Sequence, residues 1–188
     1  MSRKVLTVAL PGREYDIEIE RGLLSRAGER CRALLPKAAR LYVITDSNVA
    51  PLYGARAADS LTGAGFQVKT KVVPAGEASK NPRKLIELWE DMMAFGLTRT
   101  DAVVALGGGV VGDLAGFAAA SILRGVDFIQ IPTTLLAQVD SSVGGKVAID
   151  LKAGKNLAGA FWQPRGVLID PDCLDTLPDR TFSDGMAE

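Results

Sequence analysis

Three consecutive glycines, Gly107 to Gly109, and a fourth at Gly112 form the most chemically informative stretch of the chain. They follow the short apolar run Ala102–Leu106 and precede Val110–Leu123, in which small and apolar residues occur all round. This order predicts a strand buried on both faces, a glycine turn and the start of a buried helix. The unpaired N–H groups at such a helix start carry partial positive charge, so they can bind a phosphate or pyrophosphate.

The spacing of these glycines matches the pattern G-x-G-x-x-G, but it fits equally well a tightly packed turn that binds nothing. We expect the three consecutive glycines to take positive φ and to let a ligand approach the backbone. The stretch departs from an ordinary dinucleotide-binding opening, because several strands precede it. In addition, the acid about 20 residues further on, Asp127, starts the next predicted strand instead of ending it. A bound ribose would therefore need another partner.

Polar residues also follow two other predicted strands. Asp46 follows the strand Leu41–Thr45, and the loop carrying Glu77 and Lys80 follows the strand Phe66–Val73. The ends of parallel strands are the usual place for a ligand in an α/β sheet. A carboxylate there could hold the two hydroxyls of a ribose. Taken by itself, Asp46 or Ser47 is better explained as a helix cap, although one residue can serve both roles, and the loop can also be an ordinary solvated loop with Ser79 as a cap.

Between Arg124 and Arg165 the chain has a small excess of basic residues, which lie in glycine-rich loops beyond strand ends. The five basic residues are Arg124, Lys146, Lys152, Lys155 and Arg165, and the three acids are Asp127, Asp140 and Asp150. This excess suits an anionic ligand. For any one of these lysines taken singly, an ordinary solvated surface position is the default interpretation.

Composition restricts the class of protein. The 188 residues carry 22 basic and 22 acidic side chains, a balance that argues against a nucleic-acid partner. No apolar run is long enough to span a membrane and no secretory leader is recognisable, so we expect a cytoplasmic protein without a membrane partner. The two cysteines are expected to be buried and reduced. The chain has no histidine, which removes the usual general base and the usual metal ligand.

Strands alternate with helices along most of the chain, which predicts an α/β fold with a mainly parallel sheet and helices on both faces. Alternation around Pro11-Gly12 predicts an N-terminal hairpin, and Lys152–Asn156 is predicted as a flexible loop. The helices are expected at Leu23–Leu35, Val49–Thr62, Asn81–Phe95, Val110–Leu123, Leu135–Val139, Pro171–Leu177 and from Thr181. The strands are expected at Val5–Leu10, Tyr15–Glu20, Leu41–Thr45, Phe66–Val73, Ala102–Leu106, Asp127–Ile131, Lys146–Leu151 and Gly166–Asp170.

A set of ordered motifs resembles the N-terminal half of the 3-dehydroquinate synthase family of sugar phosphate cyclases, and the resemblance covers nearly the whole chain. The motifs are P-A-G-E-A-S-K (Pro74–Lys80), G-G-G-V-V-G-D (Gly107–Asp113), R-G-V (Arg124–Val126), I-P-T-T-L-L-A-Q-V-D-S-S-V-G-G-K (Ile131–Lys146), G-K-N (Gly154–Asn156), L-D-T-L-P (Leu174–Pro178) and G-M-A-E (Gly185–Glu188).

The resemblance implies a Rossmann-like NAD-binding domain over residues 1–180 and the start of a helical metal-binding domain over residues 181–188. In the family a divalent metal, zinc or cobalt, lies between the two domains and is held by one Glu and two His. The Glu matches Glu188, and the absence of histidine fits a chain without the helical domain. A chain of this kind is expected to be inactive alone. The family is usually a homodimer.

The reaction implied by the resemblance converts the sugar phosphate 3-deoxy-D-arabino-heptulosonate 7-phosphate into 3-dehydroquinate, a step of the shikimate pathway. NAD oxidises a substrate alcohol, phosphate leaves, and the ketone is reduced again. The residues that match the family's cofactor positions are Asp46, Glu77, Lys80, Gly109, Val110, Asp113, Thr133, Thr134, Lys146, Lys155 and Thr176. Those that match its catalytic and substrate positions are Asp140, Lys146, Lys155, Asn156 and Arg124, the last reaching into the neighbouring subunit.

Three alternatives stay open at this point. Another sugar phosphate cyclase, making an inosose or a valiolone, has similar motifs. An iron-type alcohol or glycerol dehydrogenase also has a Gly-Gly-Gly turn, although Lys146 and Lys155 favour a cyclase. A non-catalytic nucleotide-binding module is the third, and Glu188 argues against it because a module that only binds a nucleotide needs no metal ligand.

Overall fold

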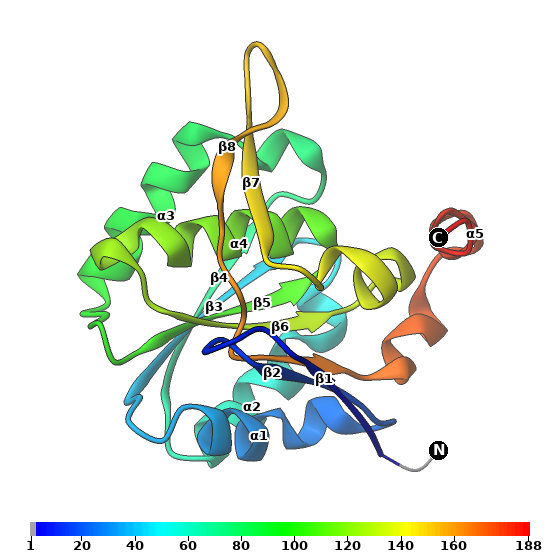
Figure 1. Ribbon diagram of the computed structural model, residues 1–188, viewed down its shortest axis with the longest axis horizontal. Coiled ribbons are helices and arrows are strands. Elements are labelled where there is room, and N and C mark those ends of the chain that lie inside the picture. Colours follow the sequence, from blue (N-terminus) through cyan, green and yellow to red (C-terminus); the bar gives the residue numbers. More distant parts are fainter. Residues whose placement is uncertain (1–2) are drawn as a thin grey trace.

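The computed structural model describes residues 3–188 and contains a seven-stranded sheet crossed by helices (Figure 1). The strand order is β1-β2-β9-β6-β5-β3-β4. The bounds of these strands are β1 Lys4–Val8, β2 Tyr15–Ile19, β3 Arg40–Asp46, β4 Gln67–Val73, β5 Ala102–Gly107, β6 Asp127–Pro132 and β9 Gly166–Ile169. Among the described strands of this sheet, β1 alone runs antiparallel to its neighbour, with Lys4 opposite Ile19, and the other adjacent pairs run parallel. The expected fold class and the N-terminal hairpin are therefore confirmed.

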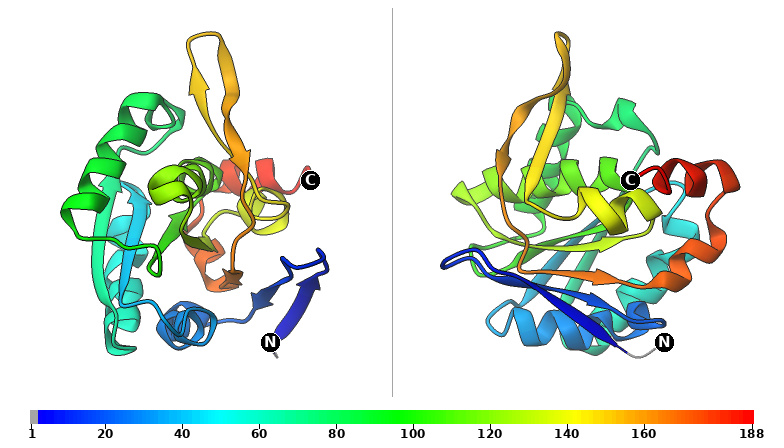
Figure 2. Two further views of the ribbon diagram at one scale, coloured as in Figure 1. Left: turned by 60° about the vertical axis from the view of Figure 1, so that its left-hand side comes forward. Right: turned by 45° about the vertical axis from the view of Figure 1, so that its right-hand side comes forward.

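Helices cover both faces of the sheet, as the views in Figure 2 show. One face packs against α1 (Ala27–Leu34) and α2 (Ala55–Gly63), and the other against α3 (Pro82–Ala94) and α4 (Gly109–Ser121). All six residues of β5 are buried because both faces of this central strand are covered. The shorter helical segments are η1 Leu23–Arg26, η2 Ala50–Gly54, η3 Glu77–Ser79, η4 Ile122–Arg124, η5 Ala137–Ser141, η6 Pro171–Thr176 and α5 Asp179–Gly185.

Several helix boundaries differ from the expected ones. The predicted helix at Leu23–Leu35 begins as the separate 3₁₀ turn η1, and the one at Val49–Thr62 begins as η2, so regular α-helix starts only at Ala27 and Ala55. The final helix starts at Asp179, before the expected Thr181, and ends at Gly185. Helix ends commonly tighten or loosen in this way, since their terminal backbone groups lack regular partners.

The expectation of a flexible loop at Lys152–Asn156 is wrong. Gly154–Phe161 forms strand β8, which pairs antiparallel with β7 (Lys146–Leu151), and this hairpin projects beyond the helices in Figure 1. The base of the hairpin packs closely on α4. A Cβ atom on Gly116 of α4 would lie 2.3 Å from Val147 Cγ1, so the absence of a side chain there admits β7. The hairpin therefore brings Lys146 and Asn156 to the same hollow as Asp113 of α4.

The direction of chain progression reverses between β3 and β5. From β3 the chain passes outward to β4 and then returns to β5 on the other side of β3, after which β6 and β9 continue away. In open α/β sheets, ligands bind at such a reversal, beyond the carboxyl ends of the strands. At this edge lie Asp46, the loop that follows Val73, the glycine turn after Leu106, and Thr133.

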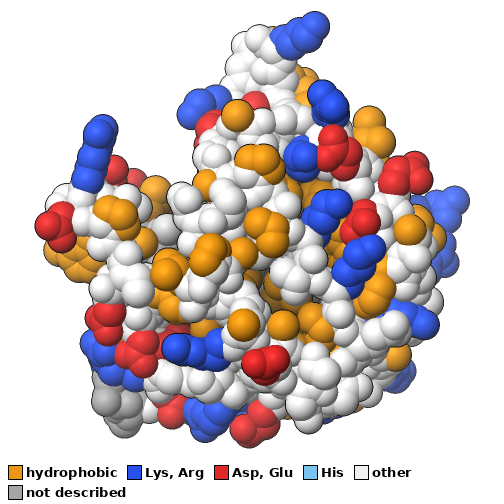
Figure 3. Space-filling model, turned by 180° about the vertical axis from the view of Figure 1, so that it is seen from behind, with side chains coloured by type: hydrophobic (Ala, Val, Ile, Leu, Met, Phe, Trp, Pro, Cys, Tyr) orange, Lys and Arg blue, Asp and Glu red, His pale blue; other side chains and the backbone are white. Residues whose placement is uncertain are grey.

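Charged side chains are interspersed on the molecular face shown in Figure 3, with Lys and Arg beside Asp and Glu. Among the residues described, 3–188, no helix is both long and apolar enough to cross a membrane.

Candidate active site at the carboxyl edge of the sheet

The glycine turn brings the start of α4 to the point where the strand order reverses. Gly108 precedes the helix with φ −79° and ψ −170°, and none of Gly107, Gly108 and Gly109 has positive φ. The expectation of positive φ is therefore wrong. Glycine is needed here for close packing instead, because a Cβ atom on Gly108 would lie 3.0 Å from Thr134 Cγ2 and one on Gly109 3.0 Å from Ser141 Oγ.

The first N–H groups of α4 have no acceptor within the helix, which is a general property of helix starts. In the part of the chain that the structure describes, no side chain caps this end, whereas Asn81 caps α3 by accepting from Lys84 N. The partial positive charge of the helix start therefore faces the edge where a ligand would lie. This arrangement suits the pyrophosphate expected at Gly109 and Val110.

Lys80 and Asp113 form an ion pair beside this helix start. Lys80 Nζ lies 2.6 Å from Asp113 Oδ2 and 3.7 Å from Glu77 Oε1, and only 4% of the Lys80 side chain is exposed. Burial raises the pKa of the Asp113 carboxyl, and the hydrogen bond from Lys80 opposes that rise only in part. The structure thus brings Glu77, Lys80 and Asp113 together at one point.

Asp46 stabilises the turn that connects β3 to η2. Its Oδ1 accepts hydrogen bonds from the backbone N–H groups of Asn48, at 2.8 Å, and Val49, at 3.0 Å. The neighbouring hydroxyl of Ser47 accepts from Ala75 N at 3.0 Å, which ties the loop after β3 to the loop after β4. The interpretation of Asp46 as a helix cap is therefore wrong, because the N-cap residue of η2 is Val49 and no side chain in the described part of the protein caps that segment.

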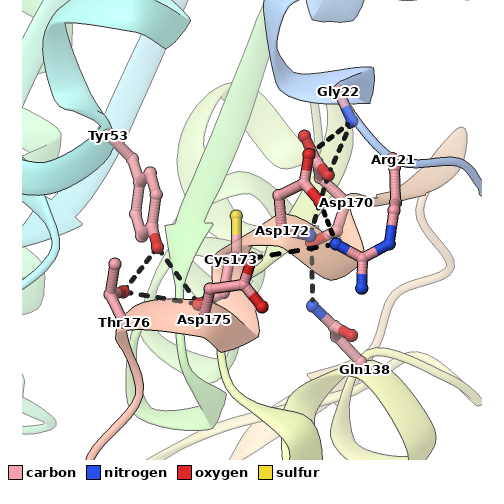
Figure 4. Close-up of polar contacts among 9 residues, drawn as sticks. All are labelled: Arg21, Gly22, Tyr53, Gln138, Asp170, Asp172, Cys173, Asp175 and Thr176. Carbon is pink, nitrogen blue, oxygen red and sulfur yellow. Dashed lines mark hydrogen bonds and ion pairs between the residues drawn. The ribbon is translucent and has the colours of Figure 1, made fainter.

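The three threonines of the expected cofactor set have different surroundings. Thr133 is buried, and its hydroxyl has no hydrogen-bond partner among the described residues. Thr134 Oγ1 accepts from Ala137 N at 3.3 Å, so it caps the following helical turn as predicted. Thr176 lies in η6, where its hydroxyl is 2.5 Å from the Tyr53 hydroxyl (Figure 4).

A hollow of about 410 Å³ is lined by residues of the β7–β8 hairpin and by Asp113 of α4. Its wall includes Asp113, Lys146 and Asn156, so a group bound there would contact residues from both α4 and the hairpin. Asn156 has φ 57°, a left-handed conformation that asparagine tolerates, and its N–H donates to Asp150 Oδ1 at 2.8 Å. This hydrogen bond lowers the pKa of the Asp150 carboxyl. Lys155 Nζ lies 3.5 Å from Glu77 Oε1, which links the hairpin to the loop after β4.

The structure does not bring all the predicted site residues together. Arg124 lies just beyond the far end of α4, whose 13 residues separate it from Gly109 by about 20 Å along the helix axis. Asp140 is exposed in η5, next to Ser141, which contacts the glycine turn. Glu188 is exposed, and residues 3–188 contain no group of three or more His, Cys, Asp or Glu side chains able to hold a metal.

Two residues that support the site were missed by sequence reasoning. Asp150 donates its N–H to Lys80 O at 2.8 Å, so it fastens the hairpin to the loop after β4. Tyr53 links η2 to η6 across 123 residues. Asp150 was counted as one of the acids near the lysines, but no local pattern marks either residue, because both contacts depend on the tertiary fold.

The sequence of the chain is similar to those of known proteins. Residues 70–184 match the sequence profile of the family described as 3-dehydroquinate synthase N-terminal. The chain is 54% identical to the 3-dehydroquinate synthase of Caulobacter vibrioides over 98% of its own length and 50% of that protein. It is 49% identical to the one from Clostridium botulinum, covering 98% of this chain and 53% of that protein.

A solved structure of 2-deoxy-scyllo-inosose synthase complexed with carbaglucose-6-phosphate, NAD⁺ and Co²⁺ has the same architecture. It superposes with a TM-score of 0.89 at 31% identity, covering 97% of this chain and 49% of that one. The chain spans about half the length of the curated relatives it matches. From the family profile, which covers more than half of its residues, we conclude that the chain belongs to the 3-dehydroquinate synthase family, in the family's N-terminal region.

Proposed function

We propose that this chain binds NAD across the carboxyl edge of its sheet. The observation that carries the proposal is the uncapped start of α4 at the reversal of strand order, beside the buried Lys80–Asp113 pair. The pyrophosphate would rest on the N–H groups of Gly109 and Val110. Asp46, Glu77 and Lys80, with Asp113 nearby, would face the adenosine half. Thr133, Thr134 and Thr176 would face the nicotinamide half, and the buried, unpartnered hydroxyl of Thr133 supports this side.

The proposed activity of the whole protein is that of a 3-dehydroquinate synthase, which forms 3-dehydroquinate from 3-deoxy-D-arabino-heptulosonate 7-phosphate with loss of phosphate. Bound NAD would supply a hydride acceptor. Lys146 and Lys155 would attract the phosphate and carboxylate of the substrate, and Asp140 and Asn156 would orient its hydroxyls. The hollow between α4 and the β7–β8 hairpin supports this placement, because Lys146 and Asn156 line it together with Asp113.

The metal and subunit proposals concern groups beyond this chain. Glu188 would supply one ligand of a divalent metal such as zinc, with the remaining ligands from elsewhere in the protein. Arg124 would complete the site of a second subunit in a homodimer, which is supported by its distance from the glycine turn along α4. We place the protein in the cytoplasm, where the proposed pathway operates.

Titration of NAD into the 188-residue chain tests the cofactor proposal. We expect saturable binding at one site by calorimetry, and competition by pyrophosphate. Gly109→Val should weaken binding by about tenfold or more, because the added side chain would press on Ser141 and displace the turn that holds the diphosphate. Gly63→Val is the matched control, since a Cβ atom there meets nothing within 4 Å. Equal affinity in both variants would contradict the proposed position of the diphosphate.

The chain alone is expected to show no turnover. Purified chain with NAD, zinc and 3-deoxy-D-arabino-heptulosonate 7-phosphate should form no 3-dehydroquinate, because residues 3–188 do not supply a complete metal site. The full-length protein under the same conditions is the positive control. Product formation by the chain alone would contradict this prediction while leaving the NAD site unaffected.

The main alternative is the activity of another sugar phosphate cyclase. It is suggested by the likeness to an inosose synthase structure at 31% identity, against 54% identity to the 3-dehydroquinate synthase of Caulobacter vibrioides. The two activities are distinguished by giving the full-length protein one substrate at a time. The substrates are glucose 6-phosphate and the seven-carbon keto acid phosphate, 3-deoxy-D-arabino-heptulosonate 7-phosphate. We expect turnover with the keto acid phosphate, whose carboxylate has no counterpart in glucose 6-phosphate.

A further inference from the structure

Two short segments join the β7–β8 hairpin to the body of the protein. Gly144 and Gly145 lead into β7 with φ 90° and 66°, and neither has a side chain that could anchor the hairpin. Trp162 follows directly after β8, and its backbone N–H donates to Gly145 O at 2.7 Å, which closes the base of the hairpin. The direction in which the hairpin points therefore depends on what holds Trp162.

The indole of Trp162 reaches the segment that connects α4 to β6. Its Nε1 donates to Val126 O at 3.0 Å, and a Cβ atom on Gly125 would lie 2.5 Å from its ring atom Cη2. The ring also packs against the buried apolar side chains on the face of the sheet covered by α3 and α4. One side chain thus ties the base of the hairpin to the body through a hydrogen bond and through close packing.

The segment that supports Trp162 has an unusual backbone conformation. Leu123 and Arg124 have φ 51° and 66°, values that residues other than glycine rarely take. Such a conformation persists only where the surrounding structure holds it. Arg99 Nε donates to Leu123 O at 3.2 Å, and the ring of Trp162 covers the next residue but one. The segment is therefore a fixed support for the indole.

A small change of angle at the base would displace the functional side chains of the hairpin. Figure 2 shows the hairpin extending from the body as a narrow arm. Asn156 precedes Trp162 by six residues, about 20 Å along a strand. A tilt of about 10° at Trp162 would move Asn156 by about 3 Å, as much as the length of a hydrogen bond. Lys146 and Asn156 line one hollow with Asp113, so a ligand there needs the hairpin at one angle.

We propose that Trp162 is a positioning residue that fixes the angle of the β7–β8 hairpin and thereby holds Lys146 and Asn156 where they meet the substrate. This inference rests on the proposed function, in which these two side chains contact the sugar phosphate. Trp162 lines a different hollow, beside Asp127 and Arg165, so its effect on turnover passes through the hairpin.

The experiment compares substrate and ADP binding in Trp162→Phe of the full-length protein. Phenylalanine removes the indole N–H and shortens the ring. The KM for 3-deoxy-D-arabino-heptulosonate 7-phosphate should rise by about three- to tenfold, the span of one hydrogen bond. The dissociation constant of ADP should stay unchanged, because its proposed contacts lie at the start of α4 and in the loops after β3 and β4. An equal loss of affinity for both ligands would overturn the proposal, since it would report a general loss of stability.

Trp89→Phe is the matched control. It also removes an indole N–H, but that of Trp89, on α3, is buried without a hydrogen-bond partner among the described residues. The KM of this variant should equal that of the wild type. An unchanged KM in Trp162→Phe, or an equal rise in both variants, would overturn the role of Trp162.

Hydrogen exchange in the 188-residue chain tests the anchor without turnover. The N–H of Asp150 donates to Lys80 O at 2.8 Å, which ties the outer part of the hairpin to the loop after β4. This amide should exchange about three- to tenfold faster in Trp162→Phe than in the wild type, and at the wild-type rate in Trp89→Phe. Equal exchange in all three would overturn the anchor. Absence of turnover by the wild-type full-length protein would overturn the proposed function, and faster exchange in Trp162→Phe would still support the anchor.

Discussion

Replacing Asp101 with alanine is expected to lower the free energy of unfolding by about 3 kcal/mol at neutral pH, because several backbone donors lose their acceptor at once. Asp101 is fully buried just before β5. Its Oδ1 accepts from Ala39 N at 3.0 Å and Arg40 N at 2.8 Å. Its Oδ2 accepts from Thr98 N at 2.9 Å and from the Thr98 hydroxyl at 2.8 Å. One carboxylate therefore joins the starts of β3 and β5.

The same contacts make this stabilisation dependent on pH. Burial raises the pKa of the Asp101 carboxyl, but the hydrogen bonds from Arg40, Thr98 and Ala39 outweigh burial, and its pKa lies below the ordinary value. A lowered pKa in the folded state gives stability that is present above the unfolded value and is lost as the pH falls through the folded value. The wild-type chain should therefore lose stability below about pH 4, and Asp101→Ala should lose less over that range.

Urea unfolding at several pH values measures both effects. Asp101→Asn is the conservative control, because it keeps one oxygen acceptor for Ala39 and Arg40 but turns an N–H₂ group towards Thr98. We expect it to fall between the wild type and Asp101→Ala at neutral pH. An unfolding midpoint of Asp101→Ala equal to that of the wild type at pH 7 would show that water replaces the carboxylate without cost.

The sheet was predictable from sequence because its strands are short apolar runs that end in turn-forming residues. Strand β5 is the clearest case, since Ala102–Leu106 has no polar residue and is buried on both faces. Strand β8 was not predictable, because Gly154-Lys155-Asn156 has the composition of a turn. The β7–β8 hairpin lies where Gly116 leaves space on α4 for Val147 of β7, and no short sequence pattern indicates such a contact between distant elements.

The site was predictable to the extent that it follows from topology. Parallel strands end at the same edge, so Asp46, the Glu77–Lys80 loop and the glycine turn had to meet. The partners of individual side chains were not predictable. Asp113 pairs with a lysine in another loop, and Tyr53 bonds Thr176 across 123 residues. Positive φ at the glycine turn was expected from residue type, whereas the observed need for glycine comes from side chains of neighbouring elements.

Replacing Lys80 with methionine is expected to lower the free energy of unfolding by about 3 kcal/mol at neutral pH, since it leaves the Asp113 carboxylate part-buried without its cation. Methionine has a similar length and no charge, so the loss reports on the charge and not on a cavity. Binding of NAD should weaken as well, because Glu77 loses the same neighbour.

The pH dependence of this loss identifies its cause. Burial already raises the pKa of Asp113, and without Lys80 nothing of comparable strength opposes that rise. A raised pKa in the folded state gives stability that is complete at acidic pH and is lost as the pH rises through the folded value. The deficit of Lys80→Met should therefore be small near pH 4 and grow towards pH 8. In the double variant with Asp113→Asn, the deficit should be smaller and independent of pH. A deficit that is equal in the single and double variants at every pH would mean that Lys80 acts through packing alone, because removing the carboxylate would then have changed nothing.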